Sequence, residues 1–252
     1  QLPGPVINPL DFYNYASGER GAVVPGSLYT MVGSGLAPDL RGCATGTSPV
    51  GGTYQTRVAG VEVQFGTVLA PILLVCNQDS REYVILQVPF ELAPNSQTSV
   101  TVRVGSGSSV VNNVQVVDLQ PGTFETADSQ GQRALALRPN GTPVTPTNPA
   151  RWGELIRFYA TGLGNLNPQA FTGVSGVPGQ TVVAPVVVGL NDAGVRLERA
   201  TYQVGSIGVY EIVFEVPQGT QTGPTRPLGL LVARPNGEVA FPANSPTIAI
   251  AQ

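Results

Sequence analysis

Several short stretches in the first half of the chain alternate between apolar and polar residues. In Val61-Glu-Val-Gln-Phe65 and Ser99-Val-Thr-Val-Arg-Val104 every second side chain is apolar, which is the period of a β-strand with one buried face. Clusters of Gly, Pro, Asn and Ser separate these stretches and favour turns. The other predicted strands here are Leu28–Val32, Ile72–Val75, Tyr83–Val88 and Val110–Val117.

The second half of the chain follows the same plan, and no long stretch has the period of a helix. Six or seven short strands in each half are typical of an immunoglobulin-like β-sandwich, although small closed barrels share this pattern. The sequence therefore predicts an all-β protein. The predicted strands of this half are Arg133–Leu137, Leu155–Tyr159, Val182–Val188, Val195–Val204, Val209–Val216, Leu228–Ala233 and Thr247–Ala251.

Two pairs of matching segments indicate an internal duplication. The segment from Gly26 to Leu36 returns from Gly153 to Leu163, which is an offset of 127 residues. Tyr83-Val-Ile-Leu-Gln-Val-Pro89 returns as Glu211-Ile-Val-Phe-Glu-Val-Pro217 with an offset of 128 residues. A period this long indicates two separate globular units rather than a solenoid. We predict two tandem sandwiches, residues 1–125 with an N-terminal arm at 1–10, and residues 126–252.

Composition excludes several kinds of chemistry. The chain has no His, and all 13 basic residues are Arg. Without His or Lys it lacks a Ser-His-Asp relay, a His-ligated zinc and a Schiff-base lysine. The 16 acidic residues are spread singly, without the spacing of a calcium loop, and nothing selects a catalytic pair. We expect no enzyme activity and no cofactor, with a carboxylate-based hydrolase as the third hypothesis.

Charge and hydropathy also limit the partners. A net charge of −3 with scattered Arg residues gives no basic patch for nucleic acid, and no apolar run is long enough to insert into a membrane. The chain begins at Gln1 instead of Met, as a processed mature protein or a fragment does. We expect an extracellular or cell-surface protein after removal of a signal peptide.

Two kinds of covalent modification are predicted. Cys43 and Cys76 both lie in the first unit, and a disulfide between them would close a loop of about 34 residues. The alternative is a reactive thiol at Cys43 beside Arg41. Asn140 begins a glycosylation sequon in a Thr- and Pro-rich loop, where a plain turn needs the same residues. The candidate glycosylation sites are Asn140, Thr142, Thr145 and Thr147.

Two N-terminal segments are candidates for contact with partners. The apolar positions Leu2, Val6, Ile7 and Leu10 of the arm are typical of a strand that copies can exchange. Phe12, Tyr13 and Tyr15 form a compact aromatic group that is either a platform for sugars or packing over the end of the first sandwich.

An ordered set of motifs resembles a known family. Pro25-Gly-Ser-Leu-Tyr29, Ala70-Pro-Ile-Leu73, Asn148-Pro-Ala150, Tyr159-Ala-Thr-Gly-Leu-Gly164 and Gly208-Val-Tyr210 are similar to the uncharacterised C-terminal domain family of Solibacter and other acidobacteria. The resemblance covers about residues 7–252 and implies an exported protein, but the family supplies no reaction and no catalytic residues. Where that family has a Ser-x-x-Gln-Ile-Asn run, this chain has Cys76-Asn-Gln-Asp-Ser-Arg-Glu-Tyr-Val84.

Taken together, the sequence predicts a secreted, non-enzymatic structural protein. Its partners are expected to be copies of itself, joined into a filament or surface layer by strand edges or an exchanged arm. The alternative is a polysaccharide-binding or adhesion module that uses the aromatic group or the loops at the strand ends.

Overall fold

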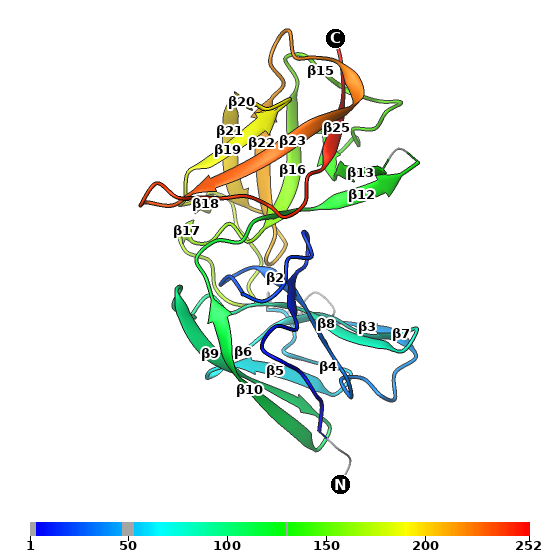
Figure 1. Ribbon diagram of the computed structural model, residues 1–252, viewed down its shortest axis with the longest axis vertical. Coiled ribbons are helices and arrows are strands. Elements are labelled where there is room, and N and C mark those ends of the chain that lie inside the picture. The colour runs from blue at the N-terminus through cyan, green and yellow to red at the C-terminus, as the bar shows by residue number, and fades with distance from the viewer. Residues whose placement is uncertain (1–3, 47–52, 130) are drawn as a thin grey trace.

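The computed structural model describes residues 4–46, 53–129 and 131–252, and its described elements are all β-strands. Figure 1 shows two sandwiches placed one after the other along the long axis, with the chain ends at opposite poles. The prediction of an all-β protein with two tandem immunoglobulin-like sandwiches is confirmed by this arrangement.

The first sandwich consists of two sheets around one core. Alternation creates this core: Val61, Val63 and Phe65 point inward and are fully buried, while Glu62 and Gln64 between them reach the surface. One sheet has the order β1 (Phe12–Asn14), β2 (Leu28–Gly33), β8 (Arg81–Gln87), β7 (Ile72–Gln78) and β3 (Gly42–Thr45). The other has the order β10 (Gly107–Val116), β9 (Ser96–Val104), β5 (Val61–Phe65) and β4 (Arg57–Val58), with β6 (Val68–Leu69) beside β5.

The second sandwich repeats this design around its own core. One sheet has the order β11 (Gly122–Thr123), β16 (Leu155–Thr161), β22 (Tyr210–Glu215), β21 (Leu197–Tyr202), β18 (Thr181–Val182) and β17 (Leu166–Asn167), with β14 (Ala136–Leu137) also on β16. The other has the order β12 (Glu125–Asp128), β13 (Gly131–Ala134), β25 (Thr247–Ala251), β23 (Gly223–Ala233), β19 (Val186–Leu190) and β20 (Ala193–Val195). β15 (Ala150–Arg151) lies on β25, and β24 (Val239–Ala240) lies on β23.

The strand pairing confirms the duplication. The order β1-β2-β8-β7 returns as β14-β16-β22-β21, and β9-β5 returns as β23-β19. The register repeats as well, because Leu28 faces Gln87 in the first unit and Leu155 faces Glu215 in the second. These pairs are related by the offsets of 127 and 128 residues that the sequence shows. Register therefore assigns each residue its counterpart in the other unit.

The first core ends at Val117 and the second begins at Leu119, somewhat ahead of the boundary that the sequence placed at 125/126. In the second unit β11 bonds to the edge of β16 at Thr161, and in the first unit Val6 bonds to the counterpart of that position, Ser34. The N-terminal arm therefore pairs with the first sandwich in the same way as the segment between the two units, which contains β11 and which we call the linker, pairs with the second. The hairpin of β12 and β13 follows β11 and is longer than the turn at the same place in the first unit.

Candidate interaction surfaces

A buried set of hydrogen bonds joins the two sandwiches end to end. We call it the junction; it lies between the start of β2 in the first unit and the end of β16 in the second. The Leu28 amide donates to Thr161 Oγ1 at 2.9 Å, and the Gly162 amide donates to Ser27 Oγ at 3.1 Å. Thr161 Oγ1 in turn donates to the Gly208 carbonyl at 2.6 Å. All of these groups are buried, so the two units share one desolvated contact.

Gln87 is the central polar side chain of the junction and is fully buried. Its Nε2 donates to the Tyr202 hydroxyl at 2.9 Å, and its Oε1 accepts from the Gly173 amide at 2.8 Å. The Tyr202 hydroxyl also accepts a hydrogen bond from the Gly208 amide, and the Tyr202 and Phe90 rings pack edge to face with their centres 6.0 Å apart. One side chain of the first unit therefore satisfies two buried groups of the second.

Three buried tyrosines surround this network, and we call Tyr29, Tyr202 and Tyr210 the junction tyrosines. Burial raises the pKa of each one well above the usual value for tyrosine, so all three are neutral at physiological pH. Tyr29 donates to Gln120 Oε1 at 2.6 Å, and the rings of Tyr202 and Tyr210 lie 5.3 Å apart.

Glycines allow the backbones to approach closely at the junction. Gly162 has a φ of 82°, and a Cβ there would overlap the Gln120 carbonyl. Gly208 has a φ of 68°, and a Cβ there would lie 2.5 Å from a Leu28 side-chain atom. Both positions therefore need glycine for conformation and for space.

The end of the first sandwich farthest from the junction is open and carries a cleft of about 560 Å³. Its lining includes Ala37, Ala59 and Gly105, whose counterparts Gly164, Ala184 and Ala233 line a pocket of about 260 Å³ in the second unit. In the second unit this end is covered by the first unit, which contributes Pro25 and Pro94 to the pocket. The same end of the fold is thus covered in one unit and exposed in the other.

The predicted arm lies on its own unit. The amides and carbonyls of Val6 and Ser34 exchange two hydrogen bonds of 2.8 and 3.0 Å. Ile7 is 7% exposed and belongs to the first core, whereas Val6 and Leu10 are more than half exposed. Leu2 lies outside the described residues. Exchange of this arm between copies stays a prediction.

Strand alternation places the members of the N-terminal aromatic group on opposite faces of the sheet. Phe12 is fully buried and contacts Phe65, so this member of the predicted binding patch offers no surface. Tyr13 and Tyr15 point the other way, with the Arg20 guanidinium 5.6 Å from the centre of the Tyr13 ring. Tyr15 is 43% exposed and lies against the edge of Phe124. Any sugar platform here therefore consists of the two tyrosines alone.

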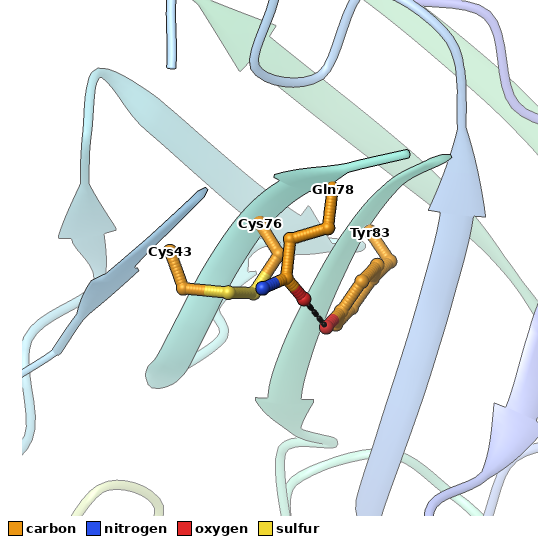
Figure 2. The surroundings of a disulfide bond; sticks show 4 residues. All are labelled: Cys43, Cys76, Gln78 and Tyr83. Carbon is orange, nitrogen blue, oxygen red and sulfur yellow. Dashed lines mark hydrogen bonds between the residues drawn. A yellow bond between two sulfur atoms is a disulfide. The ribbon is translucent and has the colours of Figure 1, made fainter. Parts of the chain in front are cut away.

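The predicted disulfide is present and excludes the free-thiol alternative. Cys43 on β3 faces Cys76 on β7 directly, with the Cα atoms 4.1 Å apart. Figure 2 shows it beside Tyr83, whose hydroxyl donates to Gln78 Oε1 at 3.4 Å. In the second unit the paired residues Thr181 and Thr201 occupy this position. The cross-link is therefore specific to the first sandwich.

The predicted glycosylation loop lies on the surface of the second unit. Asn140 is exposed at a turn, where its Oδ1 accepts from the Thr142 amide at 3.0 Å. The hydroxyls of Thr145 and Thr147 lie 3.2 Å apart and are also exposed. These contacts describe a turn, and glycosylation at the four sites stays a prediction.

The described part of the chain gathers no group of three or more His, Cys, Asp or Glu residues that could hold a metal ion. Within the same residues no helix has the length and apolar character of a membrane span. Eight of the 16 acidic side chains, all of which are among the described residues, pair with Arg, as in the contact of Arg138 with Glu154 at 3.1 Å.

Sequence reasoning missed the junction residues, although a signal for them was present. Ser27 and Leu28 belong to the motif Pro25-Gly-Ser-Leu-Tyr29, and Thr161 and Gly162 belong to Tyr159-Ala-Thr-Gly-Leu-Gly164. The two motifs that carried both the repeat and the resemblance meet in space at the junction.

The fold and the junction thus define a tandem of two immunoglobulin-like sandwiches. The chain matches no protein-family model and no curated protein. The resemblance to the acidobacterial family stays a prediction.

Solved structures with low similarity to the chain include a glucan-utilization protein of Bacteroides ovatus, SGBP-B, in complex with a mixed-linkage heptasaccharide. The identity is 12% and the TM-score 0.33, over 91% of this chain and 42% of that one. Dimeric latent PorU of Porphyromonas gingivalis is 11% identical with a TM-score of 0.31, and the match covers 100% of this chain and 24% of that one. The N-terminal Ig1-2 module of the Drosophila receptor protein tyrosine phosphatase DLAR is 10% identical with a TM-score of 0.22, and the match covers 99% of this chain and 100% of that one. The chain spans less than half of the first two proteins, and similarities this low carry no argument about function.

Proposed function

We propose that this protein is a secreted, non-enzymatic structural module that works through surface contacts and assembles with copies of itself into a filament or surface layer. The observation that supports this most is the junction, which makes one elongated body from two sandwiches. Its buried hydrogen bonds through Gln87 and Thr161 oppose bending between the units. A rigid body whose two different ends meet forms open chains when the rotation between copies does not close into a ring.

The disulfide supports an extracellular location. Disulfides persist in oxidising compartments and are rare in reducing ones. The Cys43–Cys76 bond joins an exposed edge strand to the sheet, where cellular reductants would have access to it. Fractionation of the native source, with detection of the oxidised protein outside the cytoplasm, tests this location.

Electron microscopy and light scattering of the purified protein over a wide concentration range test the assembly. Filaments or sheets are expected, whereas a monomer at every concentration would reject the proposal. The arm is tested with Val6→Pro, which removes the amide that donates to Ser34, and with Val187→Ala, an exposed valine on β19 outside the arm, as the control. Assembly that Val6→Pro leaves intact would exclude arm exchange as the joint.

A polysaccharide-binding module is the second candidate function. Tyr13 and Tyr15 favour it, because both rings lie on the outer face and Arg20 stacks on one of them. Retention on insoluble polysaccharides that is lost in Tyr13→Ala, while folding persists, is the expected result. Equal retention of the variant would reject these rings as the site.

A further inference from the structure

The two free ends of the molecule carry the counterparts of the residues that meet at the junction. The register makes Ser34 and Gly35, at the open end of the first unit, the counterparts of Thr161 and Gly162. It makes Glu154 and Leu155, at the far end of the second unit, the counterparts of Ser27 and Leu28. Figure 1 places these two ends at opposite poles of the molecule.

The chemistry of two of the junction bonds is retained at these ends, whereas the counterparts of Gln87 and Tyr202 are the different residues Glu215 and Asn77. At the junction the Leu28 amide donates to the Thr161 hydroxyl, and the Gly162 amide donates to the Ser27 hydroxyl. Ser34 also has a hydroxyl, and Gly35 has a φ of 69°, close to the 82° of Gly162. Glu154 replaces the Ser27 hydroxyl with a carboxylate, which accepts from an amide more strongly. Each donor and each acceptor of the pair therefore has a counterpart of the same kind.

The Leu155 amide is oriented like that of Leu28. The Val216 amide donates to the Glu154 carbonyl, as the Val88 amide donates to the Ser27 carbonyl. Leu155 and Glu215 are consequently a non-hydrogen-bonded pair, and the Leu155 amide points away from β22. The Leu155 side chain is 36% exposed, whereas Leu28 at the junction is 2% exposed.

The shapes of the two ends also correspond. Pro25 narrows the pocket of the second unit at the junction, and its counterpart at the far end is the larger Trp152. The open end of the first unit has the larger cleft, about 560 Å³ against 260 Å³. Trp152 packs against the core of its own unit and donates its indole N–H to the Thr220 carbonyl at 2.8 Å, so its ring is held in place and only its exposed part is available to cover the larger cleft of a second copy.

From this correspondence we propose that copies of the chain dock end to end by repeating the junction. Glu154 and Leu155 of one copy bond to Gly35 and Ser34 of the next, and the exposed part of Trp152 covers the cleft beside Ala37. The inference rests on the proposed assembly and names its joint, with a second copy as the occupant of the cleft. The arm then stays on its own unit, as the linker does at the junction.

Mixing two variants of the full chain, Ser34→Cys and Leu155→Cys, tests this contact. Under oxidising conditions a disulfide between the two variants is expected only in the mixture, and digestion with mass spectrometry identifies the joined peptides. Each variant alone is the control. A mixture that yields no more cross-link than its separate components would overturn the proposed joint.

A second measurement compares Leu155→Glu with Val187→Glu, which places the same charge on an exposed valine of β19 away from both ends. Leu155→Glu is expected to weaken association at least tenfold and Val187→Glu to leave it unchanged, with circular dichroism to verify folding. Assembly of the parent chain that resists Leu155→Glu would reject this joint and leave the proposed function standing. A parent chain that never associates would reject both.

Discussion

Gln87→Leu tests whether the junction holds the two sandwiches together. The substitution keeps the side-chain volume but removes the donor to Tyr202 and the acceptor for the Gly173 amide. Each buried polar group left without a partner costs about 1–3 kcal/mol, and the added apolar contact offsets roughly 1 kcal/mol. The Gly173 amide loses its acceptor, whereas the Tyr202 hydroxyl keeps the Gly208 amide as a donor, so we expect the free energy of unfolding to fall by about 1–3 kcal/mol.

Urea unfolding measures this change through the single tryptophan, Trp152, which reports on the second unit. Hydrogen exchange of the peptides around Leu28 and Thr161 is expected to accelerate, because the buried contact opens before either core unfolds. Gln64→Leu is the matched control, since that side chain donates to the Gly66 carbonyl and accepts from Arg103 at the exposed surface, where water can replace both bonds. Equal effects of the two substitutions would show that Gln87 does not hold the units together.

Three further outcomes follow from the same structure. Replacing Cys43 and Cys76 by Ser is expected to lower the stability of the first unit by about 3–4 kcal/mol in urea unfolding, because the bond closes a long loop, and to leave the second unit unchanged. The junction tyrosines have folded pKa values above their unfolded value of 10.0. Their contribution to stability is therefore present below pH 10 and is lost as the pH rises above this value. Phenolate absorbance should show that these tyrosines ionise only when the protein unfolds in alkali. Gly162→Ala should lower the free energy of unfolding by about 2–4 kcal/mol, because it adds backbone strain and an overlap with the Gln120 carbonyl. Gly141 has a φ of 86° and no atom within 4 Å of an added Cβ, so Gly141→Ala should cost only the strain of about 1–2 kcal/mol. Similar losses of stability for the two variants would refute the role given to close approach.

The strands and the duplication could be predicted because both are local or periodic properties of the sequence. Alternation in Val61–Phe65 depends on each residue's own neighbours, and the repeat needs only a comparison of two segments. The repeated motifs mark some of the junction residues, but their contact could not be predicted, because a polar residue such as Gln87 has the same local pattern whether its strand end meets water or another domain. The aromatic group could be predicted in part. Alternation places Phe12 and Tyr13 on opposite faces of the strand, but it does not say which of them faces the core.

Comparison of equivalent positions shows how burial has shaped the side chains at each end. Where the junction has the neutral Ser27 and Gln87, the exposed end of the second unit has Glu154 and Glu215. A neutral hydroxyl or amide loses far less than a carboxylate when water is removed. Burial raises the pKa of Glu154, but the hydrogen bonds from Arg138 and the Arg151 amide outweigh it, so the pKa stays below its usual value and the group is ionised.

Docking of a second copy at this end would therefore have to desolvate the Arg138–Glu154 pair, a cost that the neutral junction does not have. The contact between copies is consequently expected to be weaker than the contact within a copy. Association and dissociation of subunits would then occur while the two sandwiches of each chain remain joined.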